Sequence, residues 1–209
     1  MPLILRESIE NEGEIALWRV DETPDELISA LRKAGIYADL PFFRNPGRLS
    51  EWLATRVLLS VLNVKQRIVY DENGKPHLEG ENIFLSVSHS RNLIGVVLHK
   101  HHAVGIDVEH TGDRIFRVAH KFVNEHENQW LSEAYRMEQL YIIWGAKECA
   151  FKIYGLGNVD FKDHLFVSAF EMSPKGTTSV RFKKDNHDCV YQIFFQYLEQ
   201  AIITYAIAL

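Results

Sequence analysis

Patterns of apolar residues along the first half of the chain predict two helices and an antiparallel set of strands. T23-P-D-E26 supplies a helix N-cap, a first-turn proline and first-turn acids, which is typical of a helix start. Apolar residues recur at helical spacing from about Pro46, and Asn73-Gly74 followed by Pro76 favours a turn. The expected elements are helices over 23–35 and 46–62 and strands over 14–20, 83–88, 93–98 and 104–110, the last completing a meander.

The second half of the chain also offers helices followed by strands. A mixed segment over 117–127 precedes an amphipathic helix expected from about Gln139 to Tyr154. Strand-like runs follow at 164–172, 179–183 and 189–209, with a break inside the last. This order predicts an α+β fold of two similar α+β lobes, related by a pseudo-twofold axis and packed face to face with a ligand cleft between them. The lobes would be residues 1–102 and 103–209.

The overall composition fits a globular protein of one large domain or two small ones. The 209 residues are 46% hydrophobic and 24% charged, which is not a composition typical of disorder. No apolar run is long enough to cross a bilayer, and the first residues lack a signal-peptide pattern, so we expect a soluble, cytoplasmic protein without a membrane partner. Cys149 and Cys189 lie among apolar residues and are interpreted as reduced structural thiols.

The charge distribution argues against a nucleic-acid partner. The net charge is −5, with 12 Lys and Arg against 14 Asp and Glu up to His102, and 11 against 14 after it. Because neither half is basic, binding to nucleic-acid phosphates is disfavoured and any phosphate site must be local. The histidines of H99-K-H-H102 could bind zinc, but they lie between two apolar runs, where a surface turn is favoured.

One predicted strand, V104-G-I-D-V-E-H110, carries two acids. A period of two places Asp107 and Glu109 on one face of the strand, roughly 7 Å apart. Neighbouring carboxylates repel each other, and one of them should have a raised pKa unless a cation lies between them. The pattern therefore suits a hard metal ion. The alternative is a hairpin strand whose outer face is simply exposed to water.

Three further segments carry groups able to hold a charged ligand. In W144-G-A-K-E-C-A-F-K152 a spacing of four places Glu148 and Lys152 on one face of an otherwise apolar helix, and buried charges need partners. The alternative is an ordinary solvated ion pair. G74-K-P76 places a lysine in a rigid turn, and S86-V-S-H-S90 offers hydroxyls and an imidazole at a strand end. Both segments can bind an anion. The alternative is that the first is an ordinary surface turn and that the serines of the second only cap the next bend.

Taken together and in order, G-K-P, S-V-S-H-S, V-G-I-D-V-E, K-F-V-N-E-H-E and W-G-A-K-E-C-A-F-K resemble the motifs of the 4′-phosphopantetheinyl transferase superfamily. The chain is most similar to the two-lobed type, the enzymes that activate nonribosomal peptide synthetases. The resemblance implies a magnesium-dependent transferase. It would move the 4′-phosphopantetheine group of coenzyme A to a serine of an apo acyl, peptidyl or polyketide carrier protein and release adenosine 3′,5′-bisphosphate.

The resemblance also implies roles for individual residues. Asp107, Glu109 and Glu148 match the family's magnesium ligands. Lys152 and His89 would reinforce the metal's neutralisation of charge on the pyrophosphate. Coenzyme A would be held by Arg48, Arg56, Lys75, Pro76, Ser88, His89 and Lys152.

Two acids are candidates for the catalytic base. Glu148 could take the proton of the carrier serine, and so could Glu127, which matches the acid of the family pattern R-F-F-x-x-x-E. In this chain the pattern reads K121-F-V-N-E-H-E127, with Val123 in place of the second aromatic residue. The sequence does not choose between them.

Two other functions fit part of the pattern. A magnesium-dependent nuclease with D…E-x-K ligands is disfavoured, because Lys147 and Glu148 lie within a helical pattern and the chain lacks a basic surface. A catalytically inactive module that binds coenzyme A or a carrier protein would not need a complete set of metal-binding acids. Because both lobes lie in one chain, we expect an active monomer that docks its carrier protein through a local patch.

Overall fold

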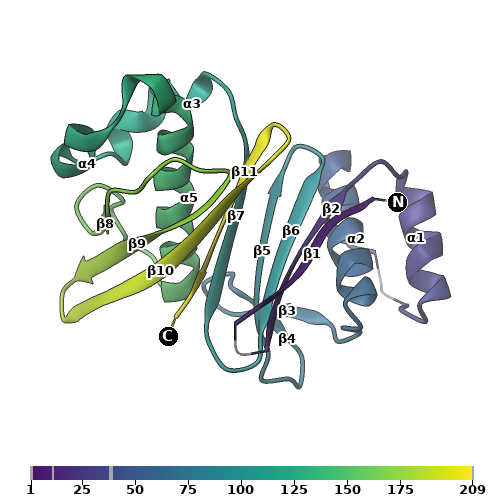
Figure 1. The fold of residues 1–209 in the computed structure, drawn as a ribbon. Coiled ribbons are helices and arrows are strands. Elements are labelled where there is room, and N and C mark those ends of the chain that lie inside the picture. Colours follow the sequence, from purple (N-terminus) through teal and green to yellow (C-terminus); the bar gives the residue numbers. More distant parts are fainter. Residues whose placement is uncertain (1, 11, 38–39, 209) are drawn as a thin grey trace.

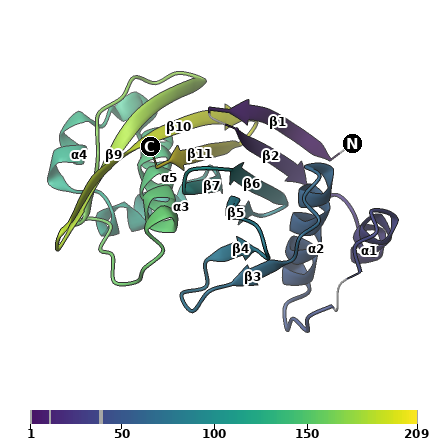
Figure 2. The same cartoon turned by 90° about the horizontal axis from the view of Figure 1, so that it is seen from below.

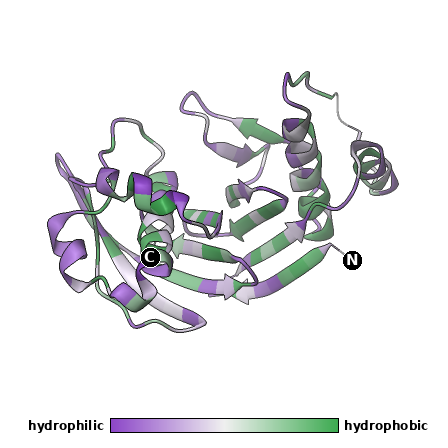
Figure 3. Cartoon of the chain, turned by 90° about the horizontal axis from the view of Figure 1, so that it is seen from above, coloured by the Kyte–Doolittle hydropathy of each residue, from purple (hydrophilic) through white to green (hydrophobic). Residues whose placement is uncertain are grey.

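The computed structural model describes residues 2–10, 12–37 and 40–208, and its architecture has the predicted α+β class. The strands form a curved layer through the middle of the molecule, and one group of helices packs against each half of that layer (Figures 1 and 2). Apolar residues are concentrated on the central strands of the layer (Figure 3). Within the described ranges, no helix is both long and apolar enough to span a membrane.

The first sheet contains four antiparallel strands in the order β1-β2-β6-β5, namely β1 (Leu3–Ile9), β2 (Gly13–Arg19), β6 (Leu93–His99) and β5 (Phe84–Ser90). Helix α2 (Pro46–Val61) packs on β2 and β6, and α1 (Pro24–Lys33) packs on α2. A hairpin of β3 (Ile68–Tyr70) and β4 (Pro76–Leu78) lies beside β5. Strand β1 is not among the predicted strands, because its continuous apolar run is only three residues long and pairing with β2 makes it a strand.

Local capping explains where α1 begins and ends. The hydroxyl of Thr23 accepts the N–H of Glu26 at 3.4 Å, while the Glu26 carboxylate accepts the N–H of Thr23 at 2.8 Å. These reciprocal bonds satisfy two N–H groups that the helix itself leaves without partners. The helix ends before Gly35, whose φ of 75° favours glycine. Both ends agree with the prediction.

The second sheet has the order β7-β11-β10-β9-β8, namely β7 (Val104–His110), β11 (Ala201–Ile207), β10 (His187–Leu198), β9 (Lys175–Lys184) and β8 (Leu165–Val167). Helix α5 (Arg136–Tyr154) packs across β7 and β11. The shorter helices α3 (Arg114–Val118) and α4 (Glu125–Trp130) precede it, with 3₁₀ turns at Ala119–Lys121 and Glu133–Tyr135.

The prediction that the D-x-E strand completes the first meander is wrong. β7 pairs with β11 along its whole length, so it is an edge strand of the second sheet. A strand most often pairs with its neighbour in the sequence, which for β7 would be β6. Instead β7 pairs with β11, almost a hundred residues later in the chain. The boundary between the two lobes and their pseudo-twofold relation stay predictions.

A close approach between α5 and β7 positions the acids of the D-x-E strand. A Cβ at Gly105 would overlap the backbone carbonyl of Cys149, so only glycine lets the helix lie this near. Gly105, Asp107 and Glu109 share one face of β7, because side chains alternate along a strand. The two acids therefore lie next to α5, the helix that carries Glu148.

The turn between the two sheets is built around His99. Its side chain is buried, and Nδ1 accepts the backbone N–H groups of His101 and His102 at 3.0 Å each. Because Nδ1 accepts, the ring proton is assigned to Nε2, which lies 2.8 Å from the carbonyl oxygen of Glu10. Segment 99–102 thus forms the turn favoured by the sequence.

We expect His99→Phe to destabilise the protein by about 1–3 kcal/mol at neutral pH, because buried backbone groups lose their partner. Burial lowers the pKa of His99, so the neutral ring contributes its full stability above about pH 6.5, and this contribution is lost as the pH falls towards the folded-state pKa. Urea unfolding at several pH values measures the effect. The variant should lose less stability than the wild type on acidification, and equal losses would show that His99 does not titrate on unfolding.

Candidate functional site

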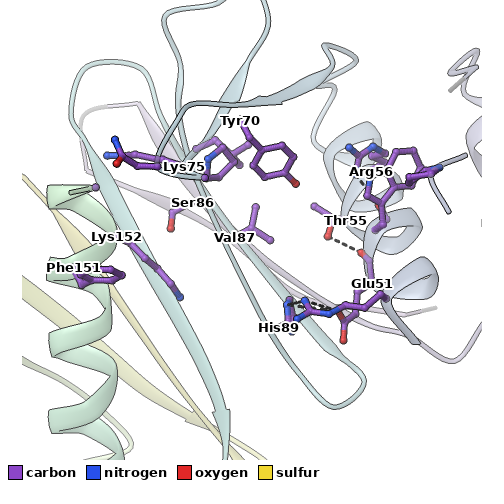
Figure 4. A pocket seen from close by; sticks show the side chains of 18 of the residues that line it. Glu51, Thr55, Arg56, Tyr70, Lys75, Ser86, Val87, His89, Phe151 and Lys152 are labelled. Atoms are coloured by element: carbon purple, nitrogen blue, oxygen red, sulfur yellow. Dashed lines mark hydrogen bonds and ion pairs between the residues drawn. The ribbon is translucent and has the colours of Figure 1, made fainter. Parts of the chain in front are cut away.

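A cavity of about 660 Å³ lies between α2, the β3–β4 turn, β5 and the C-terminal end of α5 (Figure 4). Ligand pockets in proteins commonly measure roughly 300–1,000 Å³. Aromatic rings from Trp52, Tyr70 and Phe151 contribute to its wall. Of the seven residues predicted to hold coenzyme A, six line this cavity: Arg48, Arg56, Lys75, Pro76, His89 and Lys152.

One side of the cavity is formed by Arg56, a cation on α2 whose side chain is held in place by its neighbours. The guanidinium of Arg56 lies over the indole of Trp52, 3.4 Å from the ring centroid, and donates to the Trp52 carbonyl at 3.0 Å. Burial lowers the pKa of Arg56 to about 10, and the nearby Tyr70 partly offsets this. The group therefore stays charged at neutral pH and presents a planar cation suited to phosphate or to a flat ring.

A cluster of three polar side chains, Arg48 and Glu51 of α2 and His89 of β5, lies at the cavity wall (Figure 4). Nη1 of Arg48 lies 3.1 Å from Nε2 of His89 and 3.4 Å from Oε2 of Glu51, and the same Glu51 oxygen lies 3.6 Å from His89. Glu51 thus holds Arg48, and Arg48 in turn donates to Nε2 of His89. Glu51 was missed by the sequence analysis, although its position three residues after Arg48 on a helix was an available signal.

Lys75 reaches from the β3–β4 turn to the C-terminal end of α5. Its Nζ donates to the carbonyl of Ile153 at 2.8 Å, and its aliphatic stem lies against Gly155, the left-handed residue that ends the helix. An ammonium at this end interacts favourably with the helix dipole. Burial lowers the pKa of Lys75, with Asp71 acting in the opposite direction. The contact places a cation of the first half of the chain on a helix of the second half.

Lys152 connects the cavity to the acids of β7. Its Nζ donates to the carbonyl of Ile106 at 2.7 Å and to Oδ1 of Asp107 at 3.2 Å. Burial acts to lower the pKa of Lys152, but the neighbouring acidic groups, Asp107 foremost with Cys149 and Glu148, together outweigh burial and the pKa is raised. The ammonium is therefore held charged, and it is the group shared by the cavity and the acidic cluster.

Three carboxylates lie close to one another beside Lys152. Burial raises the pKa of Glu148 to about 7, and the charges of Asp107 and Glu109 add to the shift while Lys152 opposes it. Burial and the charge of Asp107 also raise the pKa of Glu109. The repulsion predicted from the D-x-E pattern is thus present, and a cation would relieve it.

The chemistry of the three acids fits Mg²⁺, which prefers oxygen ligands and tolerates carboxylates beside phosphate oxygens. At present two of them are paired with protein cations, Asp107 with Lys152 and Glu109 with Arg114. No three His, Cys, Asp or Glu side chains within 2–10, 12–37 and 40–208 are arranged as a ready set of ligands. A bound ion would therefore share Asp107 and Glu109 with these side-chain cations.

Ser88, the seventh predicted coenzyme A ligand, does not line the cavity. Its buried hydroxyl accepts the N–H of Val108 at 3.1 Å and donates to Oδ1 of Asp107 at 3.2 Å. Both contacts are made with β7, so the hydroxyl is not directed at a ligand in the cavity. The structure therefore argues against the predicted contact between Ser88 and coenzyme A.

Glu127 lies apart from the other predicted site residues and has no exposed surface. Its carboxylate accepts the N–H groups of Asn124 and Val167 at 3.0 and 2.8 Å and forms an ion pair with Lys147 at 2.8 Å. Lys147 is equally buried and also donates to two backbone carbonyls. A carboxylate enclosed in this way does not reach a substrate, which argues against the predicted catalytic role of Glu127.

Comparison with known proteins agrees with the predicted family. Residues 103–206 match the model of the 4′-phosphopantetheinyl transferase superfamily. The chain is 28% identical to 4′-phosphopantetheinyl transferase gsp of Aneurinibacillus migulanus over 148 residues, 68% of this chain and 60% of that relative. It is 33% identical to 4′-phosphopantetheinyl transferase AcpT of Salmonella typhi over 99 residues, 46% of this chain and 45% of that relative. The chain thus spans less than two thirds of the length of either relative.

The matched stretch contains the part of the structure in which the acids converge. It includes β7 with Asp107 and Glu109, and α5 with Glu148 and Lys152. These residues carried the resemblance seen in the sequence, and the fold places them next to one another beside a cation-lined cavity. The chain belongs to the 4′-phosphopantetheinyl transferase superfamily.

Proposed function

We propose that the protein transfers the 4′-phosphopantetheine group of coenzyme A to a serine of an apo carrier protein and releases adenosine 3′,5′-bisphosphate. The observation that carries this proposal is a cavity lined by cations that is joined, through Lys152, to three converging carboxylates. A polyanionic substrate suits the cations, and Mg²⁺ suits the acids. The names of the two relatives support the same reaction.

In this proposal the cavity holds the nucleotide end of coenzyme A. Arg56 and Lys75 are fixed by contacts with backbone carbonyls, so they offer preorganised charge to phosphate groups or to the adenine ring. Arg48 is bonded to Glu51 and to His89, and an incoming phosphate would compete with the Glu51 carboxylate for Arg48. Lys152 is placed for the pyrophosphate, because it lies where the cavity meets the acids.

Mg²⁺ would be held by Asp107, Glu109 and Glu148, and when bound it would supply neutralisation of charge on the pyrophosphate. The approach of α5 to β7 brings these acids together from two elements. Glu109 would offer its Oε1 to the ion, because Arg114 and Ser90 both donate to Oε2. Lys152 would stabilise charge that develops on the leaving phosphate.

The transfer breaks the O–H bond of the carrier serine and a P–O bond of the pyrophosphate, and it forms a bond between the serine oxygen and the phosphorus of phosphopantetheine. We assign the serine proton to Glu148. Its carboxylate lies with Asp107 and Lys152 where the acids meet the cavity, so it is placed to accept that proton. The other candidate, Glu127, is enclosed by its ion pair with Lys147.

Mass spectrometry of apo carrier proteins from fatty acid, polyketide and peptide synthesis tests this function. With coenzyme A, Mg²⁺ and the protein, we expect one phosphopantetheine group per carrier protein, and none after chelation of the metal. Binding of coenzyme A without transfer to any class would favour the inactive binding module. Cleavage of labelled DNA in the presence of Mg²⁺ would favour the nuclease.

We also propose that the active species is a cytoplasmic monomer. The cavity is lined by residues from both halves of one chain, so no second subunit is needed to complete it. Because the protein carries a net charge of −5, docking of an acidic carrier protein would rely on a local patch. Light scattering of the active protein measures the oligomeric state, and an obligate dimer with residues contributed across its interface would contradict the proposal.

Arg56→Ala should raise KM for coenzyme A about 10- to 100-fold, the effect of losing a charged contact worth about 1.5–3 kcal/mol. The value of kcat should change less, because Arg56 lies on α2 and makes no contact with the acids of β7. Steady-state kinetics at varied coenzyme A measures both constants. Arg67→Ala is the control, since Arg67 is exposed and close enough to affect the pKa of Arg56 but does not line the cavity. Equal effects of the two substitutions would indicate long-range electrostatics instead of contact.

A further inference from the structure

Three serines of β5 form a seam between the two sheets. β5 and β7 lie side by side but belong to different sheets. The serines alternate along β5, so their hydroxyls all face β7. Each hydroxyl accepts one backbone N–H of β7, with Ser86, Ser88 and Ser90 bonded to Ile106, Val108 and His110 at 3.1, 3.1 and 3.2 Å.

Two of these hydroxyls make a second contact that the third does not. Ser88 donates to Oδ1 of Asp107 at 3.2 Å, and Ser90 donates to Oε2 of Glu109 at 3.4 Å. In the same register Ser86 corresponds to Gly105, which has no side chain. The second contact therefore goes to the acids of the D-x-E pattern. Ser86, which bonds to β7 but has no acid opposite it, serves as a control for Ser88 and Ser90.

Each hydroxyl binds only one oxygen of its carboxylate. Oδ1 of Asp107 receives Ser88 and Lys152, and Oε2 of Glu109 receives Ser90 and Arg114. Among the hydrogen bonds of the described residues, Oδ2 of Asp107 and Oε1 of Glu109 receive none. One oxygen of each acid is thus fixed by protein donors, and the other is left for a cation.

We infer that Ser88 and Ser90 are positioning residues that hold Asp107 and Glu109 in the orientation needed to bind Mg²⁺. The inference rests on the proposed function, because it requires the three acids to be the metal site. A hydroxyl that donates to a carboxylate restricts its rotation and leaves its charge intact, so less conformational entropy is lost when the ion binds. This role replaces the predicted contact of Ser88 with coenzyme A.

Serine-to-alanine substitutions separate this role from that of holding the sheets together. Ser86, Ser88 and Ser90 are buried to similar extents, and each substitution removes one bond of the seam. Ser88→Ala and Ser90→Ala also remove a bond to a carboxylate. All three variants should therefore lose stability in thermal unfolding, and Ser86→Ala should lose the least. Titration calorimetry with Mg²⁺ and the metal-free protein, without coenzyme A, should show affinity reduced about 10- to 100-fold in Ser88→Ala and Ser90→Ala, as for other groups that hydrogen-bond a metal ligand. Affinity should be unchanged in Ser86→Ala.

Ser88→Cys serves if the alanine variant does not fold, since a thiol fills the space of the hydroxyl but donates only weakly. It should fold and bind Mg²⁺ more weakly than the wild type. Equal loss of affinity in Ser86→Ala and Ser88→Ala would overturn the inference, because the serines would then act only through the seam.

Asp107→Asn distinguishes failure of the inference from failure of the proposed function. Mg²⁺ binding that depends on Asp107 but survives both serine substitutions would overturn the inference alone. Binding that is absent in the wild type, or unaffected in Asp107→Asn, would overturn the metal site itself.

Discussion

Glu148→Gln should reduce phosphopantetheine transfer by roughly 10²- to 10⁴-fold, the range associated with loss of a general base. The substitution keeps the shape of the side chain and removes the charge. It deletes both the proposed proton acceptor and one of the three proposed metal ligands. We therefore expect kcat to fall, and the requirement for Mg²⁺ to rise, in a carrier-protein assay followed by mass spectrometry.

The same variant should be as stable as the wild type, or more stable, in metal-free buffer. Burial and the charges of Asp107 and Glu109 raise the pKa of Glu148 to about 7, so its ionised form is disfavoured in the folded protein. Removing one of several repelling carboxylates relieves a cost of roughly 1–3 kcal/mol. Chemical unfolding measures this change. A cooperative transition at or above that of the wild type, together with lost transfer, would separate a catalytic role from a structural one.

Glu138→Gln is the matched control for Glu148→Gln. It makes the same chemical change near the other end of α5, away from the acids of β7. Its transfer activity should stay close to that of the wild type. A loss comparable to that of Glu148→Gln would mean that any change of charge on α5 impairs the protein, and the assignment of Glu148 would fall.

The parts of the site that follow local periodicity could be predicted from the sequence. Alternation along a strand places Asp107 and Glu109 on one face whatever partner the strand pairs with, and a spacing of four places Glu148 and Lys152 on one face of a helix. Caps and turn residues similarly locate the ends of α1 and the β3–β4 turn. Each of these features depends only on residues close to one another in the sequence, so a short segment is enough to predict it.

The parts that depend on long-range pairing could not be predicted in this way. No local signal states that β7 pairs with β11 instead of β6, or that the serines of β5 bond to β7. The sequence therefore predicts a contact between Ser88 and coenzyme A, whereas the hydroxyl bonds to β7. The buried ion pair of Lys147 could not be predicted for the same reason, because its partner Glu127 is brought beside it only by the fold.

Glu127→Gln should destabilise the protein by about 3–5 kcal/mol, the cost of leaving one member of a buried ion pair without its partner. Glu127 and Lys147 have side chains with no exposed surface, and their ion pair ties α4 to α5. The carboxylate also accepts the N–H of Val167 in β8. An amide keeps the shape but supplies less charge to the ammonium. Burial already lowers the pKa of Lys147 to about 8 against the opposing effect of Glu127.

Activity measured per folded molecule distinguishes this structural role from the catalytic role that the family pattern suggests. At a temperature where Glu127→Gln remains folded, we expect kcat to fall much less than in Glu148→Gln, because a group that touches no substrate alters the rate only through shifts of α5. Glu125→Gln, an exposed acid of the same helix, should change stability by less than about 1 kcal/mol. A Glu127→Gln protein with wild-type stability and a kcat reduced as strongly as that of Glu148→Gln would restore Glu127 as the base. Such a result would require the ion pair with Lys147 to open during turnover, because only then could the carboxylate reach the carrier serine.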